Sequence, residues 1–357
     1  MADLANDTPI RTPVLDRSSF PENFRDVDHL ESYLATPTPE CVADLAAVDG
    51  DIMLLGVSGK LGLTLAWLIK RAAPGKRVIG VSRFSAKGSR DWLEERGIET
   101  VSADLLDREQ VRALPRVPNV VFLAGRKFDT QGREDAMWAT NVVVPALAGD
   151  FFTDSRIVAL SSVHVYPWSD PLRGGTGESV PPAPRIGEYA NSVVGRERVL
   201  QYFSSLHGNP GRIVRFAYSV EPRYGVMQEI ADWVLRRRPI PLETGTVNLL
   251  WQGDALNQFA RLLRHCTAPT TPINIGAPET VSVRALAEYF GRIYDVEPVF
   301  SGRETDCLVV NCELAAETLG NPVVPVRTMA NWVAEWVGSG KPILGKPSKF
   351  ESRAGAF

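Results

Sequence analysis

Residues 52–62 read IMLLGVSGKLG, an apolar run followed by glycines at positions 56, 59 and 62. The run Ile52–Leu55 is typical of a short buried strand, and a helical pattern begins near the last glycine. Glycines at this spacing permit a tight turn, let the backbone approach a phosphate and let the helix pack close to the strand. The free N–H groups at the helix start complement phosphate oxygens. A strand, a glycine turn and a helix in this order predict a site for a dinucleotide.

Strands and helices alternate beyond this turn as far as residue 217. The further strands are expected at 77–82, 99–102, 119–123, 156–161 and 212–216, and the helices at 61–71, 89–96, 108–114, 137–152 and 189–206. Apolar strands joined by helices indicate a parallel sheet that is covered on both faces. We therefore predict an α/β fold in which residues 49–217 form a Rossmann-type, doubly wound parallel sheet.

The elements that follow are less regular. Expected helices at 227–237, 255–265, 283–294 and 329–337, with strands at 247–251 and 272–275, predict a smaller C-terminal α/β substrate lobe over 218–339, partly interleaved with the sheet. Residues 1–48 read as an N-terminal extension with helical stretches at 27–34 and after Pro39, and residues 340–357 form an unassigned tail. The Pro- and Gly-rich segment 166–187 exceeds an ordinary connection, which predicts either disorder or a functional lid.

Composition narrows the class of protein. The 357 residues are 44% hydrophobic, which excludes a disordered or fibrous chain, and a formal charge of −3 argues against a nucleic-acid groove. The four cysteines are far apart and form no CxxC pair, and the N-terminus shows no secretory pattern. We expect a cytoplasmic protein with a small-molecule substrate, no metal, and no membrane segment, since no apolar run approaches about 18 residues.

The end of the second strand bears on which dinucleotide binds. It closes with Ser82-Arg83 and lacks the acidic residue that accepts hydrogen bonds from an NAD ribose. The Arg83 guanidinium can instead pair with a 2′-phosphate, and Lys60 in the glycine turn would add a second positive charge. We therefore predict NADP rather than NAD; the alternative is that Arg83 is an ordinary solvated loop residue.

Two later strand ends supply further predicted contacts. Asp104 follows the third strand and is placed to accept from an adenine amino group. Leu123-Ala124-Gly125 closes the fourth strand with small residues that leave room for the middle of the cofactor. Both stretches could equally be turn residues.

Several stretches between residues 50 and 335 together resemble the extended short-chain dehydrogenase/reductases, the family of nucleotide-sugar epimerases and dehydratases. In family order they are Gly56–Gly62, Ala103-Asp104-Leu105, Leu123-Ala124-Gly125, Ala139-Thr140-Asn141-Val142, Ser161–Tyr166, and Ile273–Gly276 followed by Val281–Val283. The resemblance implies that Asn141 is the family's structural asparagine and that Ser162 holds the reacting oxygen. It implies an NAD(P)-dependent epimerase, dehydratase or reductase acting on a sugar, a sugar acid or a related small polar molecule.

The full set of predicted cofactor contacts is Gly56, Ser58, Gly59, Lys60, Leu61, Gly62, Arg83, Asp104, Leu105, Leu123, Ala124, Gly125, Lys127 and Tyr189. The predicted catalytic residues are Ser162, Tyr189, His164 and Asn141.

The chain departs from the family pattern at the centre of the chemistry. Tyr189-Ala190-Asn191-Ser192-Val193 stands where the family has Tyr-x-x-x-Lys, so the lysine is replaced by Val193, while Glu197 fits the family register. In the family that lysine binds the nicotinamide ribose and lowers the pKa of the tyrosine. A tyrosine with an ordinary pKa of about 10 is a poor general base at neutral pH but a competent proton donor, which favours the reductive direction.

Three groups are conceivable substitutes for the lysine. Arg196 lies one turn beyond Val193 on the expected helix, and Lys127 follows the fourth strand at its cofactor-facing end. His164 could be the acid or base itself, because an ordinary imidazole pKa is near 7. Arg196 could instead be a solvated helix residue, and His164 a strand-end residue that shapes the substrate pocket.

The resemblance also suggests a substrate pocket formed by His164, Asn191, Arg215, Tyr224 and Gln252. Arg215 and Arg223 would suit a carboxylate or phosphate, or else cap helices or pair with acidic residues. An alternative function is a dinucleotide-binding sensor or structural protein without hydride chemistry. Related enzymes pair through the helices that correspond to 137–152 and 189–206, which implies a possible homodimer.

Overall fold

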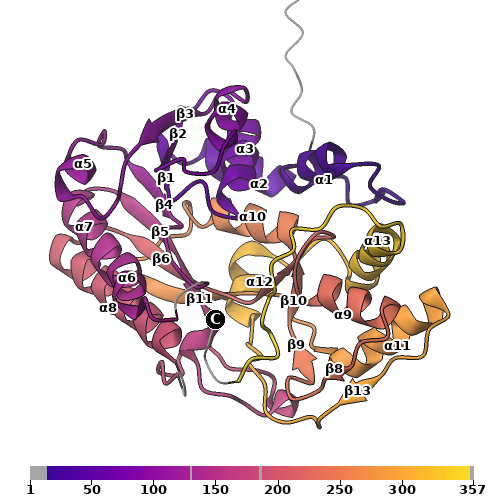
Figure 1. The fold of residues 1–357 in the computed structure, drawn as a ribbon. Coiled ribbons are helices and arrows are strands. Elements are labelled where there is room, and N and C mark those ends of the chain that lie inside the picture. Colours follow the sequence, from indigo (N-terminus) through magenta and orange to yellow (C-terminus); the bar gives the residue numbers. More distant parts are fainter. Residues whose placement is uncertain (1–13, 129–130, 185–186, 354–357) are drawn as a thin grey trace, which may run out of the picture.

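The computed structural model describes residues 14–128, 131–184 and 187–353. Its centre is a parallel sheet of seven strands in the order β11-β6-β5-β4-β1-β2-β3 (Figure 1). These strands are β1 (Ile52–Leu55), β2 (Val78–Ser82), β3 (Glu99–Ser102), β4 (Asn119–Phe122), β5 (Arg156–Ser162), β6 (Gly211–Phe216) and β11 (Thr271–Ile275). The predicted doubly wound α/β fold is confirmed.

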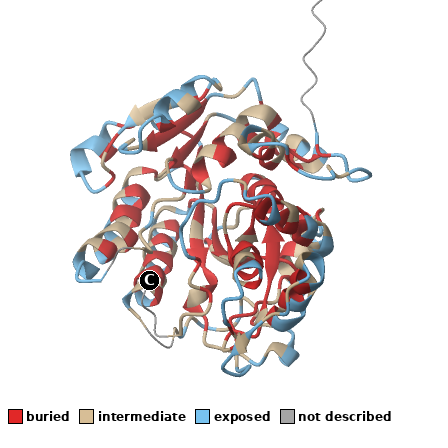
Figure 2. Ribbon diagram, turned by 45° about the vertical axis from the view of Figure 1, so that its right-hand side comes forward, coloured by how far each residue is buried: buried red, intermediate tan, exposed pale blue. Residues whose placement is uncertain are grey.

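Helices cover both faces of this sheet. They are α3 (Gly62–Ala72), α4 (Ser89–Glu94), α5 (Arg108–Arg112), α6 (Glu134–Trp138), the π-turn η1 (Ala139–Val143), α7 (Val144–Phe151), α8 (Glu188–His207), α10 (Gln252–Arg261) and α12 (Glu313–Leu319). Side chains of β1 alternate between two cores: Ile52 and Leu54 pack with α3 and α10, whereas Met53 and Leu55 pack with α5, α7 and α8. Apart from the edge strand β3, the sheet is therefore largely buried, as the red strands of Figure 2 show.

A second hydrophobic core is rich in tryptophan, and most of its elements follow β6 in the chain. Its elements are α1 (Val27–Leu34), β7 (Tyr218–Val220), α9 (Val226–Leu235), β8 (Ile240–Pro241), β9 (Thr246–Val247), β10 (Leu249–Trp251), β12 (Val281–Ser282), α11 (Val283–Tyr294), β13 (Phe300–Ser301) and α13 (Val326–Gly338). Trp251 and Trp332 pack against each other at its centre, with ring centroids 4.9 Å apart.

The two ends of the described chain pack on this frame. Helices α1 and α2 (Pro39–Ala46) lie against α10 and α3, with Thr38 and Asn257 joined by a hydrogen bond of 2.7 Å. The segment 340–353 runs back from α13 across the molecule toward the end of the central sheet (Figure 1). Phe350 of this segment is buried and stacks on Trp233.

The segment 166–187 is fixed to the rest of the fold along the part that the structure describes. The 3-10 turn η2 (Val163–Val165) precedes it, and it contains a second 3-10 turn, η3 (Pro171–Arg173). Ser169 bridges to Cys307, and Thr176 bridges to Val310. None of its described residues lines the pocket below, so the structure does not support the predicted lid; residues 185–186 lie outside the described chain.

The expected helix at 137–152 is broken into three parts. Pro145 has no N–H to donate to the Asn141 carbonyl four residues earlier, and the chain forms the π-turn η1 at this point. The interruption turns Asn141 into the buried interior, where its side chain accepts a hydrogen bond from the Arg126 N–H and its carbonyl accepts one from Arg196.

Candidate functional site

The pocket lies where the strand order reverses. From β1 the chain first adds β2 and β3 on one side and then returns to add β4, β5, β6 and β11 on the other side. Ligands of open parallel sheets bind at such a point, in the crevice beyond the carboxyl ends of the strands. A cavity of about 510 Å³ opens there. It is lined by the segments that follow β1, β4, β5 and β6, by α8, and by the segment 340–353.

The glycine turn has a conformation that only glycine allows at two positions. Gly56 has φ of +85°, and a Cβ there would stand 2.7 Å from the Cα of Ala124. A Cβ on Gly62 would stand 2.8 Å from the Cα of Val57 and nearer still to its carbonyl. The turn thus holds β1, β4 and the start of α3 in close contact, a cradle that a dinucleotide phosphate can approach.

A polar atom inside the turn is left for a ligand. The Ser58 hydroxyl is buried and has no hydrogen-bond partner among the described residues. Burial of an unpaired hydroxyl costs free energy, so a bound group that pairs with it is stabilised. The residues of the turn therefore fit the phosphates of a nicotinamide dinucleotide.

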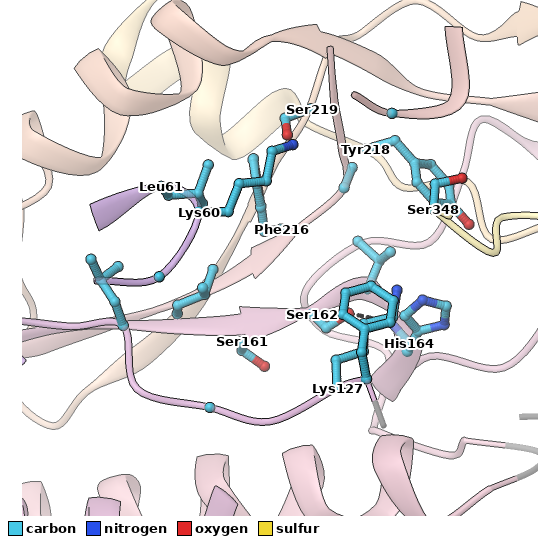
Figure 3. A pocket seen from close by; sticks show the side chains of 18 of the residues that line it. Lys60, Leu61, Lys127, Ser161, Ser162, His164, Phe216, Tyr218, Ser219 and Ser348 are labelled. Carbon is cyan, nitrogen blue, oxygen red and sulfur yellow. Dashed lines mark hydrogen bonds between the residues drawn. The ribbon is translucent and has the colours of Figure 1, made fainter. Parts of the chain in front are cut away.

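Ser162, Tyr189 and His164 meet at one end of the pocket, and Figure 3 shows Ser162 and His164 there together with Lys127. Ser162 ends β5, and its hydroxyl hydrogen-bonds to Tyr189 and also accepts from the His164 N–H at 3.3 Å. The rings of His164 and Tyr189 are 5.9 Å apart between centroids. The structure therefore places a serine and a tyrosine hydroxyl in the same wall.

Burial sets the protonation states of these groups. It raises the pKa of Tyr189, and the charge of Arg196 and the Ser162 hydrogen bond oppose that rise. Burial, with a contribution from the Lys127 charge, lowers the pKa of His164 well below its ordinary value. A neutral imidazole and a protonated phenol follow at neutral pH, so His164 is not a ready proton donor there.

The charged side chains in the wall of the pocket are all basic. The lining includes Lys60, Arg126, Lys127, Arg196 and Lys346, and no aspartate or glutamate among the described residues. Burial lowers the pKa of Lys60 to about 7 and that of Lys127 to about 8. Lys60 is nevertheless exposed by its accessible surface, so the effect of burial on its pKa is smaller than for a side chain enclosed by protein.

Lys60 and Arg83 contact different side chains in the structure. Its ammonium group lies 3.4 Å from the centroid of the Tyr224 ring, in the direction of Ser219 (Figure 3). Arg83 is exposed at the end of β2, 3.9 Å from Asp104. The hypothesis that both cations hold one 2′-phosphate stays a prediction; without a bound nucleotide, cation–π attraction draws Lys60 toward Tyr224.

The other predicted cofactor contacts divide into three groups. Gly59, Lys60, Leu61, Gly62, Leu123, Gly125, Lys127 and Tyr189 line the pocket. Gly56, Ser58 and Ala124 shape the turn beneath it. Arg83, Asp104 and Leu105 lie at the ends of β2 and β3, where the Asp104 side chain accepts from the Leu106 N–H at 3.0 Å.

Three predicted substrate residues do not reach the pocket. Arg215 is 2% exposed and forms a two-point ion pair with Glu197, whose nearer contact is 2.8 Å. Gln252 begins α10 and is buried in the fold, and Asn191 is exposed and donates to the Gly187 carbonyl. Arg215 was misplaced because β-strand alternation turns it to the opposite face of the sheet from its neighbour Phe216, which lines the pocket.

Arg223 likewise has a structural role. Its guanidinium pairs with Glu221 and with Glu31 of α1, each at 2.9 Å. His164 and Tyr224, by contrast, line the pocket as predicted. Asn141 lies behind the wall: its side chain accepts from the Arg126 N–H and donates to Ser192, each at 2.9 Å.

Sequence reasoning missed several lining residues. Tyr218 and Ser219 follow β6 and could have been found, because the carboxyl ends of parallel strands all point to the crevice. Lys346 and Ser348 come from the tail, which has no periodic pattern that would place it over the pocket. Ser348 is held there by Glu229, which accepts from both its N–H and its hydroxyl.

The fold and the pocket together define a dinucleotide-binding enzyme of the Rossmann type. Residues 52–276 match the model of the NAD dependent epimerase/dehydratase family, and the chain belongs to that family. It is an enzyme of the extended short-chain dehydrogenase/reductase type. No curated protein sequence matches the chain.

Solved structures share this fold at low sequence identity. The chain is similar to the UDP-glucose 4-epimerase of Thermotoga maritima in a structure with UDP-glucose, with 19% identity, a TM-score of 0.67, and coverage of 81% of this chain and 99% of that one. It is similar to the UDP-glucose 4-epimerase of Thermus thermophilus in complex with NAD (17%, 0.65, 80% and 98%). A short-chain dehydrogenase/reductase superfamily protein of Agrobacterium tumefaciens with bound NAD is also similar (18%, 0.67, 81% and 97%).

The described chain also lacks two kinds of feature. None of its helices is both long and apolar enough to cross a bilayer. Residues 14–128, 131–184 and 187–353 contain no group of three or more His, Cys, Asp or Glu side chains arranged to hold a metal ion.

Proposed function

We propose that the protein is an NAD(P)-dependent epimerase, dehydratase or reductase of a sugar, a sugar acid or a related polar molecule, with Ser162 and Tyr189 at the reacting oxygen. The observation that carries this proposal is the hydrogen bond between the two hydroxyls inside the pocket at the sheet crevice. A wall that keeps this pair intact favours chemistry over the alternative of a mere nucleotide sensor.

Ser162, Tyr189 and His164 have separate roles in the proposed reaction. A bound nicotinamide supplies hydride transfer. Ser162 holds the substrate oxygen by a hydrogen bond, and Tyr189, protonated at neutral pH because burial raises its pKa, donates a proton to that oxygen as a carbonyl is reduced. Neutral His164 offers a hydrogen bond that positions the substrate.

The exposed Arg83 supports a preference for NADP over NAD. It stands at the end of β2 without an acidic residue at the strand tip, and its guanidinium can pair with a 2′-phosphate. Asp104 lies beside it, so a bound phosphate would compete with that carboxylate for Arg83.

The substrate end suits a molecule that carries negative charge. Lys60, Lys127 and Lys346 line it together with the hydroxyls of Tyr218, Ser219 and Ser348. Two of the similar structures contain UDP-glucose or belong to UDP-glucose epimerases, and a nucleotide sugar would bring both phosphates and hydroxyls to such a wall. We also propose that the pocket joins a dinucleotide lobe, residues 49–217, to a substrate lobe, residues 218–339.

Nucleotide binding and turnover test the proposal. Titration with NADPH and NADH, followed by nucleotide fluorescence, should show both binding and NADPH binding about tenfold more tightly, with the preference lost in Arg83→Ala. In a panel of UDP-sugars and sugar acids assayed with NADPH or NAD, Tyr189→Phe and Ser162→Ala should lower turnover by about 10²-fold or more.

The matched control is Tyr202→Phe, which removes a hydroxyl from an exposed tyrosine on the same helix and should leave turnover unchanged. Failure of both nucleotides to bind would overturn the proposal. Full activity in Tyr189→Phe would overturn the role of Tyr189.

A further inference from the structure

Arg196 is a buried guanidinium in the wall of the pocket. It stands on α8 seven residues after Tyr189, which places both side chains on the same face of the helix, and only 4% of its surface is exposed. Its Nη1 donates to the Leu160 carbonyl at 2.8 Å and its Nη2 to Asn141 Oδ1 at 2.6 Å. Its Nε lies 3.4 Å from the Asn141 carbonyl.

The charge of Arg196 is not neutralised by these contacts. All three acceptors are uncharged, and no carboxylate of the described chain forms an ion pair with this guanidinium. The nearby Glu197 acts on Arg196 through its charge, but its oxygens bond to Arg215 and Ser161. Arg215, on the neighbouring strand β6, is equally buried but has Glu197 as its counter-ion. A buried cation without a directly bonded counter-ion is costly, and its field acts strongly on the groups around it.

Two features of the chain make room for this guanidinium. Pro145 withholds the N–H that would otherwise bond to the Asn141 carbonyl, so that oxygen is open to Arg196. Gly125 lies directly against the side chain, since a Cβ there would stand 2.5 Å from Arg196 Nη2. The glycine that ends the β4 segment therefore accommodates Arg196 as well as the pocket.

The residue one helical turn after Tyr189, Val193, is uncharged. Val193 is fully buried and packs in an apolar cluster with Val163, Val165 and Tyr166. Arg196, in contrast, lines the pocket and acts on Tyr189: its charge opposes the rise in the pKa of Tyr189 that burial causes.

We propose that Arg196 is a positioning residue that supplies the positive charge beside Tyr189 which Val193 cannot supply, and that it makes proton loss from the Tyr189 hydroxyl easier. This inference rests on the proposed role of Tyr189 in the reaction. Through its hydrogen bonds to Asn141 and Leu160, Arg196 also connects α8 to η1 and β5, which fixes the position of Tyr189 in the pocket wall.

The ionisation of residue 189 can be measured without cofactor or substrate. Difluorotyrosine placed at position 189 of the full chain has a phenol acidic enough to titrate while the protein stays folded, and its fluorine NMR signal reports the phenolate. Arg196→Gln keeps a hydrogen-bond donor but removes the charge, and should raise the pKa of residue 189 by about one unit or more. Arg196→Lys, which keeps the charge, should restore most of the difference.

Two further variants keep the test decisive. Arg212→Gln is the matched control, because Arg212 is another buried arginine bonded to neutral oxygens, the His265 carbonyl and Thr271, and lies outside the pocket lining. It should leave the titration unchanged. If Arg196→Gln does not fold, Gly125→Ala should move the pKa in the same direction, because the added methyl must displace the guanidinium.

An unchanged titration in Arg196→Gln, or in Gly125→Ala where that variant replaces it, would overturn the role of Arg196. So would an equal rise in Arg196→Gln and Arg196→Lys, since Arg196→Lys keeps the positive charge that Arg196→Gln removes. Neither result touches the binding of NADPH or NADH, whose failure would overturn the proposed function instead.

Discussion

At the scale of single residues, Gly62 fixes the geometry on which the site depends. It has no positive φ, so its requirement for glycine comes from space alone: a Cβ would press on three backbone atoms of Val57. These backbone atoms cannot rotate out of the way as the end of a side chain can. The close approach of α3 to the glycine turn therefore leaves no room for even one methyl group.

Gly62→Ala should lower the free energy of unfolding by about 1–3 kcal/mol and weaken NADPH binding, because the start of α3 must move away from the turn. Urea unfolding and nucleotide fluorescence measure the two effects. Gly75→Ala is the matched control, since a Cβ there meets no atom within 4 Å. Equal stability of the two variants would show that the turn tolerates the shift.

At the scale of elements, the parts of the site that sequence could place are those that follow regular strands. The run Ile52–Leu55 is apolar on both faces and is followed by glycines, so β1 and its turn were predictable from periodicity and steric need. The end of β5 was predictable too, but only through the family motif around Ser162. Arg215 was misassigned, because a motif gives the neighbourhood of a residue and not the side of the strand that it faces.

The tail could not be placed from the sequence for a different reason. Segment 340–353 forms no helix or strand, and its position depends on single contacts to distant residues, such as those of Ser348 with Glu229 and of Leu344 with Arg223. Such contacts produce no periodic pattern in the amino-acid sequence. The same holds for Arg196, whose burial follows from the π-turn around Asn141.

The burial of the Glu229 carboxyl beside Ser348 predicts a pH dependence of stability. Burial raises the pKa of Glu229 from 4.5 to about 7. The folded carboxyl therefore holds its proton more tightly than the unfolded one, and the free energy of unfolding should fall as pH rises from about 4.5 to about 7 and then level off. Lys60 and Lys127, whose pKa values burial lowers, act above that window.

Glu229→Gln should flatten this slope by up to about 1.4 kcal/mol per pH unit, measured by urea unfolding between about pH 5 and about pH 7. Ser348→Ala is the companion variant: it keeps the carboxyl but removes a hydrogen bond that lowers its pKa, so the slope should persist. Identical slopes in the wild-type protein and in Glu229→Gln would mean that Glu229 does not titrate in this range.

At the scale of the whole molecule, segments from far apart in the sequence complete one pocket. The ends of β1, β4, β5 and β6 supply its floor, and the tail crosses from α13 to supply Lys346 and Ser348 (Figure 1). On the face of the sheet that carries α7 and α8, the molecule instead presents apolar side chains to solvent. Trp138, Val143, Tyr202 and Leu206 are 37%, 46%, 61% and 57% exposed, on α6, η1 and α8.

These side chains favour a homodimer formed through α6, η1, α7 and α8, helices that pack on one another. Leu206→Glu should then shift the protein from dimer to monomer at micromolar concentration in sedimentation velocity, because a charge buried in an apolar interface is costly. Leu172→Glu is the matched control: Leu172 is 92% exposed but lies in η3, away from these helices, and should leave the dimer intact. A wild-type protein that sediments as a monomer would contradict the prediction, as would a dimer that both variants leave unchanged.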